Sequence, residues 1–365
     1  MKMAPILRAL SNHVPTIPWL LVHTGQHYDK DMNDKLFEDL KLPRPQINLE
    51  VGSNTHAVQT AEVMRRFEPV IDQHHPACVV VVGDVNSTLA CALVAVKKNV
   101  PTVHVEAGLR SYDRGMPEEI NRVLTDQIAD RLYITERSAA ENLRLEGIPG
   151  ERVSFVGNVM IDSLIANRAA ARSARETLFS AGLDQAVLGN VNGFGLVTLH
   201  RPSNVDSLEK LKEILQILAV VSSSLPLVFA LHPRTRANID RFNLMYLVEP
   251  KRMLLLPPQG YLEMLGLMSE ATVVLTDSGG LQEETTALGV PCLTIRENTE
   301  RPITVDQGTN ILVGTNRKAI LSAVQEILAG RGKRGRVPEL WDGCAADRIA
   351  ADLWQWLRTS KNPTT

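Results

Sequence analysis

Short apolar runs alternate with amphipathic stretches along almost the whole chain. Such runs, bounded by polar and turn-forming residues, are typical of strands that are buried on both faces, and the amphipathic stretches between them predict crossover helices. This alternation predicts parallel sheets covered by helices. The expected strands are Trp19–His23, Cys78–Val82, Thr102–Val105, Arg131–Ile134 and Val153–Val156 in the first half, and Gly195–Thr198, Leu227–Leu231, Met253–Leu256, Thr272–Thr276 and Cys292–Ile295 in the second.

The two series of strands are separated by a helical stretch expected over Asp162–Ala181. A chain of 365 residues suits two domains of ordinary size. We therefore expect two doubly wound α/β domains, 1–165 and 166–342, and a final segment, 343–365, whose helix packs back on the first domain and ends in a polar tail. Ligands of such sheets bind beyond the carboxyl ends of the strands.

The composition of the chain limits which classes of binding partner are expected. Hydrophobic residues make up 44% of the chain and charged residues 22%, with a net charge of -2, so no electrostatic reason exists to expect nucleic acid or an anionic membrane as partner. The cysteines are scattered without metal-binding or redox spacing, so no metal site is expected. No apolar run approaches the roughly 18 residues of a membrane span, and no signal peptide is evident, which indicates a cytoplasmic protein.

The most informative stretch is residues 276–301, TDSGGLQEETTALGVPCLTIRENTER. It predicts a strand, a turn over Asp277–Gly280 and a helix over Leu281–Leu288 whose first amides are free to bind phosphate. Gly279 and Gly280 permit close approach of a diphosphate, and Glu283 or Glu284 is placed to bind ribose hydroxyls. An ordinary helix start capped by Ser278 is the alternative interpretation.

Further polar clusters follow other predicted strands. Each alone is explained as a helix cap, a polar loop or an exposed ion pair, but they share one position, at strand ends. The clusters are TGQHYD (24–29), GDVNST (83–88), HVEAGLRS (104–111), PEEINR (117–122), TLHRPSNVD (198–206), HPRTR (232–236) and RENTERP (296–302).

Taken together and in this order, these motifs resemble the non-hydrolysing UDP-N-acetylglucosamine 2-epimerases over nearly the whole chain. The resemblance implies a GT-B fold, in which two Rossmann-like domains enclose the active site, and a homodimer. It also implies reversible conversion of UDP-N-acetylglucosamine to UDP-N-acetylmannosamine for polysaccharide synthesis, without a cofactor.

The resemblance assigns roles to individual positions. The family's catalytic carboxylates match Asp84, Glu106 and Glu118, and its catalytic histidine matches His200. The resemblance also matches Lys2, Arg122, Ser278, Gly279, Gly280 and Glu284 to positions that bind the substrate, and the clusters at strand ends add His232, Arg234 and Arg301.

The chain departs from the family's pattern in two places. Family members begin with a strand and a loop before the segment that matches Lys2, so the first strand is expected to be missing here, through a late start or a truncation. Gln26 and His27 match a regulatory loop, but Asp29 stands where bacterial members carry glutamine, which makes activation by substrate doubtful.

The mechanism that the resemblance implies is elimination of UDP to 2-acetamidoglucal, followed by re-addition. It requires acid and base groups on both faces of C2, which the carboxylates are expected to supply. His200, the amides after Ser278 and Arg234 or Arg301 would stabilise charge on the departing UDP. The alternatives are a hydrolysing epimerase, a GT-B glycosyltransferase and an inactive protein that binds nucleotide sugars.

Overall fold

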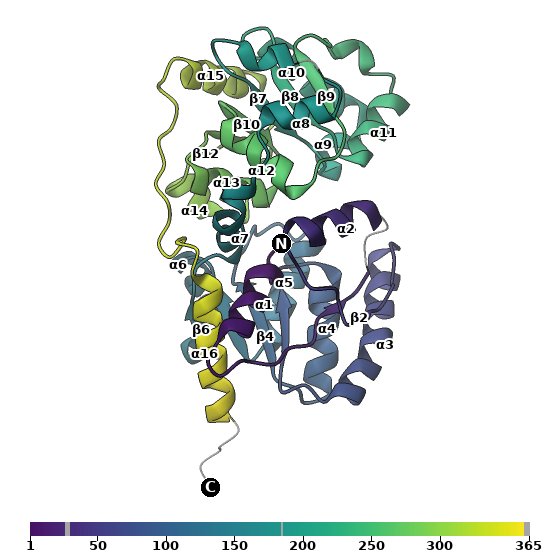
Figure 1. Cartoon of the computed structure of the whole chain (residues 1–365), viewed down its shortest axis with the longest axis vertical. Helices are drawn as coiled ribbons and strands as arrows, with labels where there is room; N and C mark the ends of the chain where they lie inside the picture. The colour runs from purple at the N-terminus through teal and green to yellow at the C-terminus, as the bar shows by residue number, and fades with distance from the viewer. Residues whose placement is uncertain (26–29, 184, 361–365) are drawn as a thin grey trace. The chain divides into compact units, whose positions relative to one another are not determined.

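The computed structural model describes residues 1–25, 30–183 and 185–360 (Figure 1). The chain forms two compact units. Unit 1 comprises Met1–Ile165 and Glu339–Thr365, and unit 2 comprises Ala166–Pro338. The chain thus leaves unit 1 once and returns to it.

Unit 1 is built on parallel strands. In the described part of the chain they form a two-stranded sheet, β1-β2, and a four-stranded sheet, β3-β4-β5-β6. The strands are β1 (Val22–His23), β2 (Ile47–Asn48), β3 (Val79–Val82), β4 (Thr102–Ala107), β5 (Arg131–Ile134) and β6 (Val153–Phe155). The helices are α1 (Met3–Asn12), α2 (Lys30–Asp39), α3 (His56–His74), α4 (Asn86–Lys97), α5 (Pro117–Ile128), α6 (Arg137–Leu145), the 3-10 turn η1 (Gly150–Arg152), α7 (Val159–Asn167) and α16 (Ala345–Ser360).

Helices on both faces of the larger sheet explain its continuous apolar strands. Val79 and Val81 of β3 pack in a cluster with residues of α3 and α4. Val80 and Val82 pack against the opposite cluster, which includes residues of α1 and α16. Because successive side chains of a strand point to opposite faces, all four valines are needed to fill both layers.

The returning helix α16 is fixed to unit 1 by polar contacts. Asp162 of α7 accepts hydrogen bonds from the amides of Ala345 (3.2 Å) and Ala346 (2.7 Å), which begin α16. Burial raises the pKa of Asp162 despite these bonds. Further along α16, Asp352 accepts from Arg131 Nε (2.9 Å) and the Tyr133 hydroxyl (2.8 Å) of β5.

Unit 2 contains one parallel sheet among its described residues, in the order β12-β11-β10-β7-β8-β9. Its strands are β7 (Gly195–Thr198), β8 (Leu227–Ala230), β9 (Met253–Leu256), β10 (Val273–Thr276), β11 (Cys292–Thr294) and β12 (Asn310–Leu312). Its helices are α8 (Ala174–Ser180), α9 (Pro202–Val205), α10 (Leu208–Val221), α11 (Pro233–Arg241), α12 (Tyr261–Glu270), α13 (Gly279–Leu288), α14 (Pro302–Asp306) and α15 (Arg317–Leu328), with 3-10 turns η2 (Arg168–Ala170), η3 (Gln185–Gly189) and η4 (Met245–Leu247).

The structure corrects the helix expected over Asp162–Ala181. Helix α7 ends at Asn167, the 3-10 turn η2 follows, and α8 begins only at Ala174. Ser173 starts the second helix with a capping box, in which its hydroxyl accepts from the amide of Glu176 and the Glu176 carboxylate accepts from the Ser173 amide. Such a cap stabilises a new helix start, so the periodic pattern belongs to two helices rather than one.

The expected strands are present with ends shifted by at most two residues, except for Trp19–His23, of which only Val22–His23 forms a strand. Two further strands were not predicted. These are β2 and β12, with two and three residues. Runs so short carry too few alternating positions to be recognised in a sequence. In addition, α13 begins at Gly279, inside the stretch expected to be a turn.

Candidate active site

The carboxyl ends of β3 and β4 bring a lysine and a glutamate together. Glu106 lies where the register between β4 and β5 shifts, and its φ of 73° is in the left-handed region. Its carboxylate accepts a hydrogen bond from the Lys2 ammonium. Gly83, directly after β3, also has a positive φ, of 74°, and a Cβ there would lie 3.3 Å from both Glu106 Oε2 and Lys2 Nζ. Positive φ is uncommon for a non-glycine residue, and at Glu106 it coincides with the register shift that turns the end of β4.

Arg122 on α5 holds the second carboxylate, Asp84. Its Nε and Nη2 atoms lie 3.0 and 2.7 Å from Asp84 Oδ2. Its Nη1 atom donates to Glu119 Oε2 at 2.6 Å. Asn121, from the same helix, donates to the Asp84 carbonyl oxygen at 2.9 Å. Helix α5 therefore fixes both the backbone and the carboxylate of Asp84.

Glu119 was not predicted as a site residue, but it organises this part of the sheet edge. It is 2% exposed, and besides Arg122 it accepts from the Ser111 amide and hydroxyl and the Tyr112 amide, each at 2.9 Å. Its neighbour Glu118 is half-buried in the first turn of α5. Glu118 lies four residues before Arg122 and therefore on the same side of the helix.

A buried polar network lies beneath these carboxylates. His104 of β4 has Nδ1 2.6 Å from Asp126 Oδ1 and Nε2 2.8 Å from the Gly83 carbonyl oxygen. Asp126 also accepts from Arg110 Nη2 at 2.7 Å. Burial alone would raise the pKa of Asp126, but the neighbouring His104 and Arg110 hold it below its ordinary value. The network fixes the turn at Gly83, which carries Asp84.

In unit 2, a similar group of polar contacts is arranged around the side chain of Asp277, which follows β10. The buried carboxylate accepts from the amides of His200 (3.1 Å) and Arg201 (2.9 Å) and from Asn204 Nδ2 (3.1 Å). It also lies 3.0 Å from His200 Nδ1. Burial would raise the pKa of Asp277, but the His200 contacts and these donors lower it overall. Asp277 thereby fixes the orientation of the His200 ring after β7.

Two other predicted residues lie on this edge. The ring of His232, after β8, has its centroid 5.7 Å from that of His200. Partial burial, followed by the charges of His200 and Arg234, lowers the pKa of His232. The Arg234 guanidinium forms an ion pair with Asp206, with Nε 2.7 Å from Oδ1.

The Ser278-Gly279-Gly280 motif forms the start of α13, with Ser278 as the N-cap residue. A Cβ on Gly279 would lie 2.5 Å from Glu300 Oε1, so a larger residue there would displace that carboxylate. Glu300 in turn lies 2.8 Å from Arg296 Nη2 and 3.8 Å from Arg201 Nη2. Glu300 therefore connects two arginines to the start of α13, where the first amides of the helix could bind phosphate.

Glu284, one turn further along α13, is buried beside Tyr261 of α12. The tyrosine hydroxyl donates to Glu284 Oε1 at 3.0 Å. Burial is the largest influence and raises the pKa of Glu284 to about 7. The adjacent Glu283 lies 2.9 Å from Arg301 Nε, so the predicted Arg301 contacts the neighbouring glutamate.

The structure thus brings Lys2 together with Glu106 and Asp84 with Arg122 in unit 1, and His200 with His232 in unit 2. Gln26 and His27 lie outside the described residues. Within the part of the chain that is described, no group of three or more His, Cys, Asp or Glu residues is placed to hold a metal ion. The same part contains no helix long and apolar enough to cross a membrane.

Two parallel α/β units, one with a glycine-rich helix start beside arginines and the other with carboxylates at its strand ends, define a nucleotide-sugar enzyme of the GT-B class. Comparison with known proteins identifies the family within this class. The family model described as UDP-N-acetylglucosamine 2-epimerase matches residues 9–353. The chain belongs to the UDP-N-acetylglucosamine 2-epimerase family.

Individual relatives of this chain are also named as 2-epimerases of nucleotide sugars. The chain is 42% identical to a Methanocaldococcus jannaschii UDP-N-acetylglucosamine 2-epimerase over 96% of this chain and 95% of that protein. It is 41% identical to a Pseudomonas aeruginosa UDP-2,3-diacetamido-2,3-dideoxy-D-glucuronate 2-epimerase over 93% and 92% of the two chains. The crystal structure of the M. jannaschii enzyme with UDP-GlcNAc and UDP superposes with a TM-score of 0.83 at 41% identity, covering 97% of this chain and 96% of that one.

Proposed function

We propose that this chain interconverts UDP-N-acetylglucosamine and UDP-N-acetylmannosamine. The observation that carries the proposal is the pair of carboxylates at the ends of β3 and β4, each held by one cation: Glu106 by Lys2 and Asp84 by Arg122. Groups arranged in this way can exchange protons with a substrate while keeping a fixed orientation. Family membership supplies the substrate class.

The C2 hydrogen of the sugar is not acidic by itself, so its removal is coupled to departure of UDP. A carboxylate of unit 1 takes the C2 proton, the bond between C1 and the UDP oxygen breaks, and C1=C2 forms in 2-acetamidoglucal. In the return step a proton is delivered to the opposite face of C2, and the UDP oxygen attacks C1. Atoms balance and no oxidation occurs, so the scheme needs neither nicotinamide nor a metal.

In this proposal the proton transfers are assigned to Asp84, Glu106 and Glu118. Glu119 is a positioning residue, because it holds Arg122, which in turn holds Asp84. The contacts among these groups support the roles of Asp84 and Glu106. The place of Glu118 on the same side of α5 as Arg122 supports its inclusion.

Unit 2 is proposed to hold UDP. The amides that begin α13 at Gly279 and Gly280 would bind the diphosphate. Arg301 and Arg234 lie near the ends of β11 and β8 and would add positive charge. His200, oriented by Asp277, and His232 would stabilise charge on the departing phosphate. Glu284 would accept hydrogen bonds from ribose hydroxyls.

A second candidate substrate is a UDP-2,3-diacetamido uronic acid. The Pseudomonas relative named for such a sugar is 41% identical to this chain, as is a Methanococcus maripaludis relative named for N-acetylglucosamine. The chemistry at C2 is the same, so the two substrates differ only in the groups that the rest of the sugar ring carries.

Product analysis tests the proposal. The purified protein is incubated with each nucleotide sugar, and the products are separated by anion exchange. We expect UDP-N-acetylmannosamine without release of free UDP. Stoichiometric UDP with free N-acetylmannosamine would indicate the hydrolysing reaction, and tight binding without any product would indicate an inactive binding protein. Glu141→Gln, which changes an exposed carboxylate paired with Arg144 on α6, is the matched control for Glu106→Gln.

We also propose that the protein is a cytoplasmic homodimer. All four cysteines are free thiols, as expected in a reducing compartment. On α5, Ile120 and Leu124 lie one turn apart with 41% and 46% of their surfaces exposed, which supports an interface there. Light scattering on the purified protein, with Leu124→Lys as the disrupting variant, tests the dimer.

A further inference from the structure

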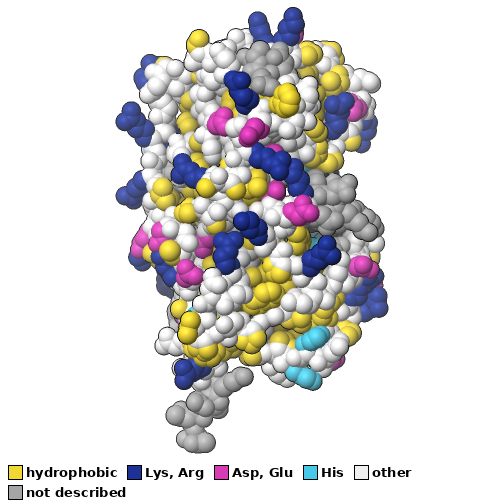
Figure 2. Space-filling model, in the orientation of Figure 1, with side chains coloured by type: hydrophobic (Ala, Val, Ile, Leu, Met, Phe, Trp, Pro, Cys, Tyr) yellow, Lys and Arg dark blue, Asp and Glu magenta, His cyan; other side chains and the backbone are white. Residues whose placement is uncertain are grey.

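His104 is a buried histidine to which the proposed chemistry assigns no role. It lies within β4, opposite Val81 of β3, and is fully buried. Other histidines lie on the surface, where Figure 2 draws them in cyan, and His75 at the end of α3 is one of the exposed ones. Burial of an imidazole is costly unless its ring nitrogens have hydrogen-bond partners. The partners of His104 therefore indicate what this side chain does.

One ring nitrogen of His104 holds the backbone next to Asp84. Nε2 lies 2.8 Å from the carbonyl oxygen of Gly83. A carbonyl oxygen carries no proton, so Nε2 must be the donor in this hydrogen bond. The Gly83 carbonyl belongs to the same peptide unit as the amide nitrogen of Asp84, and a peptide unit is planar. The bond from His104 therefore fixes the peptide plane that leads into Asp84.

The other ring nitrogen connects His104 to helix α5. Nδ1 lies 2.6 Å from Oδ1 of Asp126, which belongs to that helix. The second carboxylate oxygen of Asp126 accepts from the Gly108 amide at 3.0 Å and from Arg110 Nη2 at 2.7 Å. Because these donors hold the Asp126 carboxylate in place, its contact with Nδ1 sets the orientation of the imidazole ring.

Helix α5 also holds the other side of Asp84. Asn121 donates to the Asp84 carbonyl oxygen at 2.9 Å, and Arg122 Nη2 lies 2.7 Å from the carboxylate. Side-chain donors therefore hold both peptide units that flank the Asp84 Cα, His104 on one side and Asn121 on the other. Rotation of either unit would move the carboxylate, and a misplacement of about 1 Å can slow a reaction about 100-fold.

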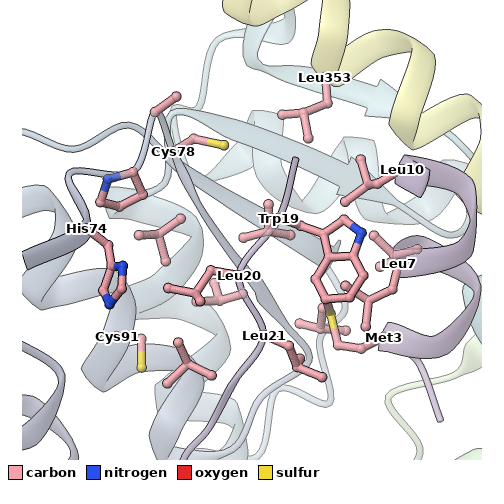
Figure 3. Close-up of a pocket in the computed structure, with 18 of the residues that line it drawn as sticks. Met3, Leu7, Leu10, Trp19, Leu20, Leu21, His74, Cys78, Cys91 and Leu353 are labelled. Carbon is pink, nitrogen blue, oxygen red and sulfur yellow. The ribbon is translucent and has the colours of Figure 1, made fainter. Parts of the chain in front are cut away.

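The surroundings of Gly83 offer no replacement for the bond from His104. A Cβ on Gly83 would lie 3.3 Å from Glu106 Oε2 and from Lys2 Nζ, so the turn packs closely against that ion pair. The large cavity of unit 1, about 980 Å³, has a mainly apolar lining that includes Trp19 (Figure 3). Its described lining residues include neither His104 nor Gly83. Water in this cavity therefore does not reach the Gly83 carbonyl.

We infer that His104 is a positioning residue for proton transfer by Asp84. This inference rests on the proposed function, in which Asp84 exchanges a proton with C2 of the sugar. The Nε2–H group of His104 holds the peptide plane between Gly83 and Asp84, and Asp126 holds the ring. Because His104 is fully buried, it does not touch the substrate. Its effect therefore falls on the rate of proton transfer and not on the binding of UDP.

Two substitutions separate the roles of the two ring nitrogens. Glutamine places its amide nitrogen near the position of Nε2, so His104→Gln can still donate to the Gly83 carbonyl. Asparagine places its amide nitrogen near the position of Nδ1, so His104→Asn can still donate to Asp126 but leaves the Gly83 carbonyl without its donor.

The two variants should differ in kcat. We expect kcat within about fivefold of the parent value for His104→Gln, and a fall of at least about 50-fold for His104→Asn. The affinity for UDP, measured by calorimetry, should change by less than about twofold in both variants. The control His75→Gln, which changes an exposed histidine, should leave kcat and the affinity for UDP as in the parent.

Two further readouts do not depend on activity. Amide exchange in peptides that cover residues 82–88 should be at least about tenfold faster in His104→Asn than in His104→Gln. In the parent protein labelled with isotopic histidine, the NMR signal that His104→Gln removes should come from a ring whose Nε2 carries a proton.

Several results decide the inference. Equal kcat in the two variants, or an Nε2 of His104 that carries no proton, would overturn it. If His104→Asn does not fold, a protonated Nε2 together with parent-like amide exchange in His104→Gln supports the inference, and an unprotonated Nε2 contradicts it. If the parent protein forms no epimer, the proposed function fails and the role in proton transfer fails with it. The exchange and the ring signal then still show whether His104 holds the peptide between Gly83 and Asp84.

Discussion

Replacing Glu284 by glutamine tests whether burial governs the ionisation of this carboxyl. Glu284 is 2% exposed, and its pKa is raised from 4.5 to about 7, chiefly by burial. A carboxyl whose pKa is higher in the folded than in the unfolded state stabilises the fold at pH values below its unfolded-state pKa. This stabilisation is lost as the pH rises through the folded-state pKa. The free energy of unfolding of unit 2 should therefore fall between pH 4.5 and about 7.

The size of this fall follows from the pKa difference. Each pKa unit corresponds to 1.36 kcal/mol, so a rise from 4.5 to about 7 is worth roughly 3 kcal/mol. Glutamine keeps the acceptor for the Tyr261 hydroxyl but does not ionise. Glu284→Gln should equal the parent near pH 4.5 and be more stable by roughly 3 kcal/mol at pH 8.

The assay must report on unit 2 by itself. The four tryptophans, at positions 19, 341, 354 and 356, all lie in unit 1, so tryptophan fluorescence does not follow unit 2. Hydrogen exchange in peptides covering β10 and α13, measured with urea at pH 5 to 8, gives the local free energy of unfolding. Tyr261→Phe is the control, because loss of the hydroxyl donor should move the fall to higher pH.

Parallel pH profiles for the parent and Glu284→Gln would refute the reasoning. They would show that Glu284 ionises at its ordinary pKa in the folded protein, which requires water or a cation beside the carboxylate.

Other predictions concern the candidate site. Glu119→Gln should lower the free energy of unfolding by about 2 kcal/mol or more in urea titrations, since it breaks a buried pair with Arg122. Glu118→Gln should change the free energy of unfolding by less than about 0.5 kcal/mol, but it should reduce the rate of epimerisation about 100-fold. Asp277→Asn should lower kcat about tenfold or more, because the His200 ring loses its charged partner, and unchanged kcat would exclude an orienting role. Lys2→Met should slow epimerisation by a similar factor with little change in the affinity for UDP measured by calorimetry. Dialysis against EDTA should leave the initial rate unchanged, and a loss restored by a divalent cation would contradict the metal-free scheme.

The sequence could place several candidate residues at strand ends, because parallel strands bring their carboxyl ends together. Asp84 and Glu106 follow apolar runs directly, and Arg122 lies on a recognisable helix beginning at Pro117. Glu118 was predicted as a site residue and Glu119 was not, because which side of α5 is buried depends on packing against the sheet. Here Glu119 is the buried residue.

Other features require the folded backbone. The positive φ of Glu106 arises at a register shift between β4 and β5, which no local pattern encodes. Asp277 looked like one residue of a glycine-rich turn, yet it joins His200, Arg201 and Asn204, which lie more than 70 positions earlier in the chain. The break between α7 and α8 could have been found from Ser173 and Glu176, whose spacing matches a capping box.

The most direct test of the central claim is the fate of the C2 hydrogen in deuterated water. With UDP-N-acetylglucosamine as substrate, proton NMR should show UDP-N-acetylmannosamine carrying deuterium at C2, with Glu106→Gln slowed by about 100-fold or more and Glu141→Gln unaffected. Product that retains its original C2 hydrogen, or a Glu106→Gln variant that exchanges at the parent rate, would contradict proton transfer by the carboxylates at these strand ends.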